Sequence, residues 1–357
     1  MKSKRLMPFL TAAVMLFSSL SPLSCLSVSA EEKEVTVNGL NFTISNGEAT
    51  LTGATKSPVN LVVPSTVNGV PVTKIGEDAF YENKVIETVS VPSSVKVMEA
   101  EAFRYCENLT KVTMAEGVQS IGSVQFYFCQ KLKEINIPKS LTSIGSQCFT
   151  STAWIYDQRA KSKNGLVIFN NILIDGVEAT GNCKIPETVT QIAANAFINS
   201  EIYQVFIPKS ISYIPQGAFS YCKKLAGVTV ANPNCVFACM EENKGEDIYY
   251  CCFFNIATST GGFNFSGPMR GYLGSTAQAY AEKHHVWFNI QGDIDRDGKL
   301  TADDSNLILI EYLTTDVLNG ATTMTREQAK SADYDFDDKI TADDANDVLY
   351  AYLDALM

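Results

Sequence analysis

A phenylalanine recurs through the middle of this chain at a nearly constant interval, and this periodicity limits the folds that the chain can adopt. Successive copies lie 23 residues apart at first, at Phe80, Phe103, Phe126 and Phe149. After a gap of 48 residues the pattern resumes with Phe197 and Phe219, which are 22 residues apart. Fixed self-similarity at this period is typical of a solenoid. The gap is close to two periods, so we expect it to hold one degenerate repeat.

Each repeat also contains a short segment in which apolar and polar residues alternate, as in LTKVTM (109–114) and LAGVTV (225–230). Alternation of this kind places the apolar residues on one face of a strand. One such strand cannot bury its apolar face alone, so stacked copies are expected to form a parallel sheet with the phenylalanines behind it. Three cysteines follow a repeated phenylalanine by three residues and are expected to form one internal column: Cys106, Cys129 and Cys222.

The other face of these strands is expected to point outward, and it is mostly small and polar. Its residues include Thr88, Ser90, Lys111, Thr113, Glu134, Asn136, Gln204, Phe206 and Thr229. A carbohydrate platform usually needs several aromatic rings, and a peptide groove needs apolar pockets. The pattern therefore favours a solvated face or a broad polar contact with another protein.

The repeated pattern I-P-x-S-V-x-x-I-G-x-x-A-F-x-x-C-x-x-L resembles the BspA-like, bacterial surface-protein class of leucine-rich repeats. The segments PKSLTSIGSQCF (138–149) and AEGVQSIGSVQFYFCQKLKEINIP (115–138) carry this resemblance most clearly. NGLVIFNNILIDG (164–176) resembles the hairpin-like insertion of that class, and GYLGSTAQAYAEKHHVWFNI (271–290) resembles its end cap. The resemblance implies a solenoid that binds a protein or another surface, but it does not identify the ligand.

The last part of the chain is strongly acidic. Residues 292–357 contain 14 Asp and 2 Glu against 5 Lys or Arg, which gives a net charge of −11, equal to that of the whole chain. Nucleic-acid binding needs basic patches, so this segment argues against nucleic acid as a partner. The concentration of carboxylates suggests cations instead.

Two segments of this acidic region place oxygen donors at the offsets of a twelve-residue calcium loop. In the first acidic loop (292–304) the expected ligands are Asp293, Asp295, Asp297, the backbone carbonyl of Lys299, Thr301 and Asp304. In the second acidic loop (332–344), forty residues later, they are Asp333, Asp335, Asp337, Lys339, Thr341 and Asp344. The sequence therefore predicts two bound Ca²⁺ ions. Gly298 suits the sharp turn at the sixth position, whereas Asp338 at the same place weakens the second loop without excluding it.

Both loops end in Asp rather than Glu, and each is followed by one apolar segment. These features resemble the type I dockerin of bacterial cellulosomes. The resemblance implies a small helical module that binds a cohesin module of a scaffolding protein in a calcium-dependent way. It assigns the cohesin contacts to Ala302, Asp303, Leu309, Ile310, Ala342, Asp343, Leu349 and Tyr350.

These contact positions are more apolar than is usual in that family, which implies a different cohesin specificity. A core role for Leu309 and Leu349 fits the pattern equally well. Between the loops, Thr325 to Gln328 form a capping-box pattern that predicts a short middle helix. The forty-residue spacing is longer than the family norm and predicts an extra turn in the connection.

The N-terminus has the order of a secretory signal peptide. Lys2, Lys4 and Arg5 precede an apolar run, and small residues ending at Ala30 suggest the cleavage site. No later apolar run is long enough to span a membrane, so the protein is expected to be secreted and extracellular, in a cellulosome or at the cell surface. Nine cysteines then remain, and their odd number leaves at least one thiol unpaired.

The sequence offers little for catalysis. Its only histidines, His284 and His285, are adjacent and lie in the expected end cap, which disfavours a His-dependent triad or a zinc site. A carboxylate pair among the scattered acidic residues is not excluded by this argument. Repeats and docking module occupy nearly the whole chain, so we expect a protein that is not an enzyme.

The predicted architecture is α+β: a leucine-rich repeat solenoid with repeats of about 22–23 residues, followed by a small α-helical dockerin with two calcium loops. The expected boundaries are a signal peptide (1–30), an N-terminal cap (31–60), repeats (61–230) with an insertion around 155–182, a degenerate repeat with a C-terminal cap (231–290), and the dockerin (291–357). The predicted function is that of a non-catalytic cellulosome component whose solenoid binds an unknown protein or polysaccharide. The alternatives are an adhesin for plant polysaccharide and an unrecognised carbohydrate-active enzyme.

Overall fold

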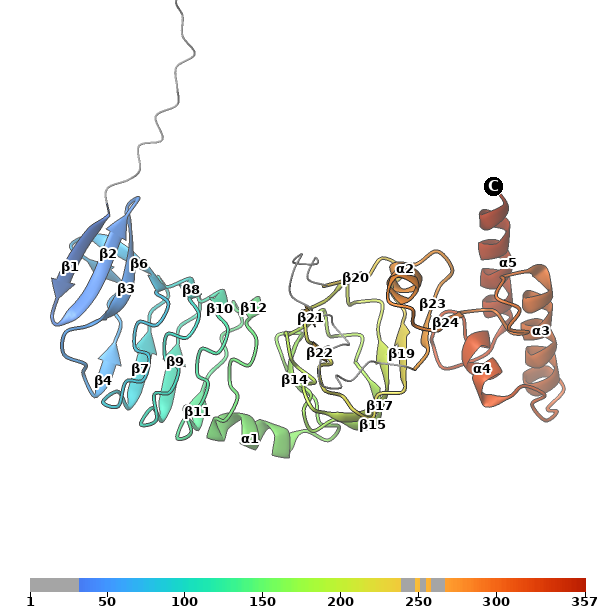
Figure 1. Ribbon diagram of the computed structural model, residues 1–357, viewed down its shortest axis with the longest axis horizontal. Helices are drawn as coiled ribbons and strands as arrows, with labels where there is room; N and C mark the ends of the chain where they lie inside the picture. Colours follow the sequence, from blue (N-terminus) through green and yellow to red (C-terminus); the bar gives the residue numbers. More distant parts are fainter. Residues whose placement is uncertain (1–31, 239–247, 251–254, 258–266) are drawn as a thin grey trace, which may run out of the picture.

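The computed structural model describes residues 32–238, 248–250, 255–257 and 267–357. The predicted signal peptide lies outside these residues, as do Cys239, Cys251 and Cys252. The described chain forms an elongated array of short strands, with a helical module at its C-terminal end (Figure 1). In this part of the chain, no helix combines the length and apolarity needed to cross a bilayer.

Three antiparallel strands close the N-terminal end of the array: β1 (Lys33–Val37), β2 (Leu40–Ser45) and β3 (Glu48–Ala54). Two Asn-Gly pairs form the turns between them, at Asn38-Gly39 and Asn46-Gly47, and all four residues have positive φ. This is the conformation that a two-residue hairpin turn requires. β3 then pairs in parallel with β6 (Val70–Ile75), so the cap continues directly into the repeats.

The first half of the solenoid consists of two parallel ribbons of short strands. One ribbon contains β4 (Asn60–Val62), β7 (Thr88–Val91), β9 (Lys111–Met114) and β11 (Glu134–Ile135). The other continues from β6, which β5 (Thr66–Val67) joins in an antiparallel pair, through β8 (Val97–Met98), β10 (Ser120–Ile121) and β12 (Ser143–Ile144).

The phenylalanine column is confirmed in this half. Phe80, Phe103, Phe126 and Phe149 are buried, and successive rings stack with centroids 5.3, 5.9 and 5.9 Å apart. Cys106 and Cys129 form the expected internal column here, but Cys222 is half-buried and packs against the separate core of the second half, so the three do not form one column. Each of the three thiols donates to the carbonyl of the phenylalanine in the preceding rung. These Sγ–O distances are 3.1 Å for Cys106, 3.0 Å for Cys129 and 3.0 Å for Cys222. The six described cysteines are all free thiols.

The insertion interrupts the solenoid. It contains α1 (Ala153–Lys161) and a hairpin of β13 (Val167–Phe169) and β14 (Ile172–Asp175), whose turn places Asn170 and Asn171 at positive φ. β14 pairs in parallel with β16 (Gln191–Ile192), so the hairpin supplies the strand of the expected degenerate repeat. Among the described strands, the ribbon that contains β6 ends at β12, which does not pair with β14.

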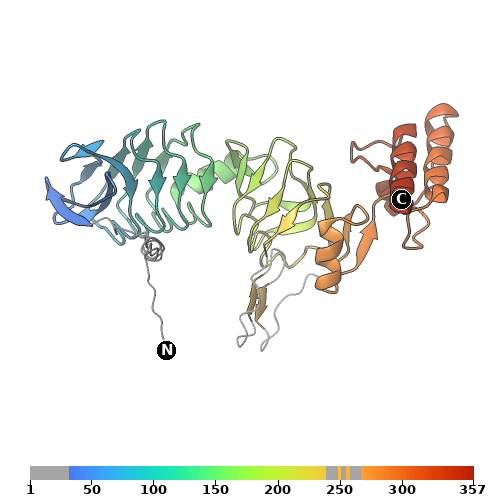
Figure 2. The same cartoon turned by 90° about the horizontal axis from the view of Figure 1, so that it is seen from above.

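The second half has its own core and its own five-stranded parallel sheet. Its strands are β15 (Thr180–Lys184), β17 (Glu201–Ile207), β19 (Gly227–Val230), β23 (Met269–Gly271) and β24 (Phe288–Ile290). Smaller pairs are formed by β18 (Tyr213–Ile214) with β20 (Val236–Phe237), and by β21 (Ile248–Tyr250) with β22 (Asn255–Ala257). The β21–β22 hairpin projects from one side of the array (Figure 2).

Helix α2 (Thr276–Lys283) lies in the segment expected to cap the array and begins at Ser275, whose side chain accepts from Gln278 N. It buries Ala277, Tyr280 and Ala281 against the core of the second half. β24 then adds the last strand of the sheet beside β23.

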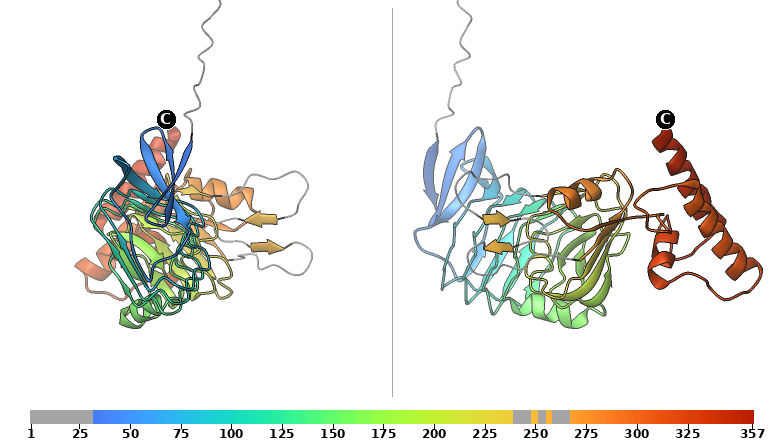
Figure 3. Two further views of the ribbon diagram at one scale, coloured as in Figure 1. Left: turned by 90° about the vertical axis from the view of Figure 1, so that its left-hand side faces the viewer. Right: turned by 45° about the vertical axis from the view of Figure 1, so that its right-hand side comes forward.

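The C-terminal module contains α3 (Ala302–Tyr312), a π-helical turn η1 (Leu313–Val317), α4 (Arg326–Ala332) and α5 (Ala342–Leu356). The two long helices α3 and α5 stand side by side in Figure 1, and Figure 3 shows the module at one end of the molecule. Their core includes Ile308 and Val348, both fully buried. α4 begins at the predicted capping box, and η1 provides the expected extra turn.

Candidate metal centres and docking surface

The first acidic loop gathers three carboxylates. One oxygen from each of Asp293, Asp295 and Asp297 lies within 4.8 Å of the others. The loop holds Asp293 in place, since its carboxylate accepts from Arg296 N at 2.7 Å and from Gly298 N at 3.0 Å. Burial, assisted by neighbouring carboxylates, raises the pKa of Asp293 above its usual value. Like charges at this distance destabilise one another unless a cation offsets them.

The second acidic loop repeats this arrangement with Asp333, Asp335 and Asp337, whose oxygens also lie within 4.8 Å of one another. Asp333 Oδ2 accepts from Asp338 N at 3.1 Å. Its other oxygen, Oδ1, is buried and has no hydrogen-bond donor among the described residues. Burial raises the pKa of Asp333 to about 6. A buried carboxylate oxygen without a donor fits a position that faces a hard cation.

The sixth positions of the two loops have the same backbone conformation despite their different residues. Gly298 has φ 83° and Asp338 has φ 71°. Aspartate reaches this left-handed region more readily than most residues, so the turn is kept in both loops.

The remaining predicted ligands occupy other roles in this structure. Asp304 does not join the group of three carboxylates. Instead it accepts from Ile294 N at 2.7 Å and from Thr301 N at 2.9 Å. Asp344 repeats these bonds with Tyr334 N and Thr341 N. The amide groups of Lys299 and Lys339 donate to Asp297 and Asp337.

The hydroxyls of the predicted ligands Thr301 and Thr341 cap the helices that follow the loops. Each accepts from the backbone amide two residues later, and each forms a capping box with Asp304 or Asp344. The pattern T-A-D-D in both copies was a signal for these caps that the sequence analysis did not use. In each loop three carboxylates therefore converge, while the twelfth residue, Asp304 or Asp344, hydrogen-bonds to backbone amides of the loop.

This donor set fits a calcium ion. The side-chain atoms that converge in each loop and could ligate a metal are carboxylate oxygens, which hard divalent cations prefer as ligands.

The residues assigned to cohesin contact are mostly exposed. Exposed fractions are 38% for Leu309, 55% for Ile310 and 64% for Tyr350. Asp303 and Asp343 are exposed, while Ala302, Ala342 and Leu349 are half-buried. The neighbouring Ile308 and Val348 fill the core, so a core role for Leu309 is wrong. Further exposed apolar side chains lie along the same helical segments, at Leu313, Val317, Leu318, Leu353 and Leu356.

A row of aromatic side chains in the first half was missed by the sequence analysis. Tyr81, Tyr105 and Tyr127 come from consecutive rungs, and their rings meet edge to face at 5.9 and 6.0 Å. The guanidinium of Arg104 lies 5.8, 4.9 and 5.4 Å from the three ring centroids. Tyrosine shortly after the repeated phenylalanine in three consecutive repeats was the signal for this row.

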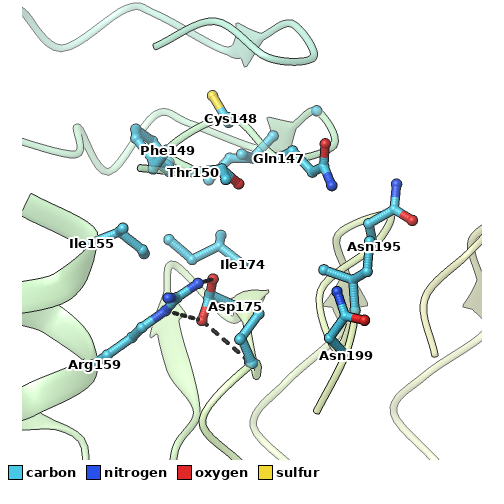
Figure 4. Close-up of a pocket in the computed structure, with 14 residues that line it drawn as sticks. Gln147, Cys148, Phe149, Thr150, Ile155, Arg159, Ile174, Asp175, Asn195 and Asn199 are labelled. Carbon is cyan, nitrogen blue, oxygen red and sulfur yellow. Dashed lines mark hydrogen bonds and ion pairs between the residues drawn. The ribbon is translucent and has the colours of Figure 1, made fainter. Parts of the chain in front are cut away.

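A cavity of about 250 Å³ lies where the two halves of the solenoid meet (Figure 4). Cys148 and Phe149 line it from the first half, and Asp175 and Asn195 line it from the second. Arg159 of α1 donates two hydrogen bonds to Asp175, at 2.9 and 2.7 Å. The side chains of this pair are 13% and 11% exposed, so the ion pair is an internal tie at the junction.

The comparisons with known proteins concern the repeats. The model of the BspA type leucine rich repeat region matches in 6 copies over residues 60–168 and 158–238, which together span 179 of the 357 residues. No curated protein matches the chain.

Several solved structures are similar to parts of the chain. A leucine-rich repeat protein from Bacteroides capillosus is 33% identical over 34% of this chain and 93% of its own, with a TM-score of 0.31. A leucine rich repeat protein from T. pallidum is 23% identical over 56% of this chain and 85% of its own, with a TM-score of 0.36. A leucine rich cell surface protein from Faecalibacterium prausnitzii is 22% identical over 57% and 72%, with a TM-score of 0.36. On the family match and its six repeats, the chain belongs to the proteins with a BspA type leucine rich repeat region.

Proposed function

We propose that this is a secreted, non-catalytic repeat protein whose C-terminal module binds two Ca²⁺ ions and docks on a cohesin module of a scaffolding protein. The solenoid then presents a binding surface for a protein or polymer. The observation that carries the proposal is the pair of matching acidic loops, each with three carboxylates within 4.8 Å. The similar left-handed turns and the unsatisfied oxygen of Asp333 support the same role.

Calorimetric titration of the full chain with Ca²⁺ tests the metal sites. We expect two bound ions. Asp335→Asn removes one charged donor from the second loop and should leave one ion bound with the original affinity. Asp354→Asn removes the same charge near the end of α5 and should leave both ions bound. Failure of the unaltered chain to take up Ca²⁺ contradicts the proposal.

The docking partner is tested separately, by capture of the full chain on immobilised cohesin modules with Ca²⁺ or with chelator. Ile310→Asp places a charge on the exposed apolar surface of α3 and should reduce capture at least tenfold. Val62→Asp alters a solenoid side chain that is 67% exposed and should have no effect. Capture that persists unchanged in chelator contradicts calcium-organised docking.

Adhesion to polysaccharide is a second candidate function, and the tyrosine row is the observation in its favour. Exposed aromatic rings at regular spacing can stack on sugar rings, and Tyr81 is 41% exposed. Gel retardation in a panel of plant polysaccharides tests it, with Tyr81→Ala compared against Tyr156→Ala on α1. Equal mobility of both variants and the unaltered chain in every polysaccharide counts against adhesion through this row.

A further inference from the structure

The second acidic loop lies against the solenoid. Phe336 meets Phe206 of β17 with ring centroids 5.4 Å apart, and it meets Tyr272 at 5.5 Å. Asp338 forms an ion pair with Lys184 of β15. The hydroxyl of Tyr272 donates to the carbonyl of Tyr334 at 3.0 Å. One loop of the module therefore contacts three separate segments of the solenoid.

The contacts alternate along the loop with the converging carboxylates. Asp333, Asp335 and Asp337, at the first, third and fifth positions, bring their oxygens together. Tyr334, Phe336 and Asp338, at the second, fourth and sixth positions, contact the solenoid. The loop is coiled, with Phe336 and Asp338 in the left-handed region at φ 66° and 71°, and the residues that contact the solenoid are not the ones whose oxygens converge. The loop thus has one face for a cation and another for the solenoid.

Helix α4 extends the same interface. Arg270 of β23 is 6% exposed, and its guanidinium donates to Ser331 Oγ and to Glu327, the latter at 3.1 Å. Lys330 donates to Gln204 of β17 at 3.3 Å and to Glu327 at 3.0 Å. A cavity of about 210 Å³ remains between these residues and the second loop, so the interface is not packed throughout.

The first acidic loop faces the solenoid across a cavity of about 670 Å³, which Arg296 and Gly298 line together with Arg270 and Trp287. Among the described residues, no ring contact or ion pair joins this loop to the solenoid. Ile294, at its second position, is buried in the core of the module. Its fourth and sixth positions are Arg296 and Gly298, which have neither the ring of Phe336 nor the carboxylate of Asp338. The sixth position is aspartate rather than glycine in the second loop, and there its carboxylate forms an ion pair with the side chain of Lys184.

We propose that the second acidic loop is a calcium-dependent clamp that fixes the helical module on the strand face of the solenoid. The inference rests on the proposed calcium function of this loop and adds a role for its opposite face. Without a cation, the three carboxylates repel one another and the loop opens. Opening changes the backbone that positions Phe336 and Asp338, so the contacts with Phe206, Tyr272 and Lys184 are lost together.

The double variant Phe336→Ala/Asp338→Gly removes both clamp side chains and restores the glycine found in the first loop. All three carboxylates remain, so the variant should still bind two Ca²⁺ ions. Tyr156→Ala, which removes an exposed aromatic ring on α1 away from both acidic loops, is the matched control. Each full-length protein is studied by small-angle X-ray scattering and by hydrogen exchange, with saturating Ca²⁺ or with chelator, and its bound ions are counted by calorimetry.

In Ca²⁺, the unaltered chain and Tyr156→Ala should share one compact scattering profile, with slow exchange in β15 and β17. Chelator should increase the radius of gyration and speed this exchange at least tenfold. The double variant in Ca²⁺ should resemble the unaltered chain in chelator. If the double variant binds two ions and its scattering and hydrogen exchange match those of the unaltered chain in Ca²⁺, the clamp is overturned and the calcium function stands. Failure to bind any ion overturns the clamp and the proposed calcium function together.

Discussion

Gln125 departs from the repeat at a position inside the solenoid. The residue before the repeated phenylalanine is small in the other rungs, as at Ala102, Cys148, Ala196 and Ala218. Gln125 is fully buried, and neither Oε1 nor Nε2 has a hydrogen-bond partner among the described residues. Burying an amide without partners costs free energy that an apolar side chain of similar size does not.

We therefore expect Gln125→Met to increase the free energy of unfolding by about 1–2 kcal/mol. Methionine keeps most of the volume and can adapt to an irregular space. Urea denaturation followed by circular dichroism measures the change. Gln119→Met, at an exposed position two residues before Ile121, should have no effect. A loss of stability in Gln125→Met shows that the amide has partners.

Cys222 predicts a dependence of stability on alkaline pH. Burial raises the pKa of this thiol from the ordinary value of 9.0 to about 11. The folded state therefore keeps the proton that the unfolded state releases, so stability is full below about pH 9 and falls until about pH 11. The loss attributable to Cys222 is about 2 kcal/mol across this window.

The check compares the unaltered chain with Cys222→Ala in urea denaturation at several pH values. The variant should lose about 2 kcal/mol less between pH 8 and pH 11. Burial raises the pKa of Cys235 to about 12, so Cys235→Ala should also differ, with its effect extending to higher pH. Identical pH profiles for the unaltered chain and Cys222→Ala contradict the assignment.

Among the elements, the strands and loops that follow local spacing were predictable, and those that depend on distant contacts were not. The hairpin of β13 and β14 follows from Asn170-Asn171 between two apolar runs. The end of the β6–β12 ribbon has no such signal. At this junction α1 follows, and Arg159 pairs with Asp175, which lies 16 residues later and belongs to no repeated motif.

We expect Arg159→Ala to reduce the free energy of unfolding by about 3–5 kcal/mol, because it leaves the Asp175 carboxylate buried and unpaired. The double variant Arg159→Met/Asp175→Leu removes both charges and should recover most of the loss. Thermal denaturation of the three proteins measures the difference. Lys161→Ala, which breaks an exposed pair with Asp157 on the same helix, should change stability by less than about 1 kcal/mol. If Arg159→Ala and Lys161→Ala reduce the free energy of unfolding equally, the buried ion pair between Arg159 and Asp175 does not stabilise the junction.

At the scale of the whole molecule, the described residues form three apolar cores, one in each half of the solenoid and one in the helical module. The sequence showed the repeats and the acidic loops because both are fixed spacings along the chain. It did not show that the module covers part of the strand face. Phe206, expected to point outward, is half-buried because it contacts Phe336, which lies 130 residues later. Two aromatic residues so far apart carry no local pattern.

Scanning calorimetry should therefore resolve more than one transition, and chelator should affect them unequally. An ion at one hundred times its dissociation constant stabilises the folded module by about 2.7 kcal/mol, and chelation removes this contribution. The transition of the first half, whose core runs from Leu40 to Ile172, should not move. Asp295→Asn/Asp335→Asn should show no response to chelator. Equal shifts of all transitions contradict a calcium effect confined to the module and its interface.

Only Gln291 separates the last solenoid strand, β24, from the first acidic loop, and hydrogen bonds hold both Gln291 and the first residue of the loop, Gly292. Gln291 Nε2 donates to the carbonyl of Lys330 at 2.8 Å, and Gly292 N donates to that of Ser331 at 3.0 Å. A flexible linker of many residues would let a tethered ligand sample a wide volume around its anchor. Here hydrogen bonds make the connection rigid, so a ligand on the solenoid would be held at one angle and one distance from the docking module. A fixed geometry raises the effective concentration of the ligand for a neighbouring partner that lies at this angle and distance. It lowers the effective concentration for partners placed elsewhere.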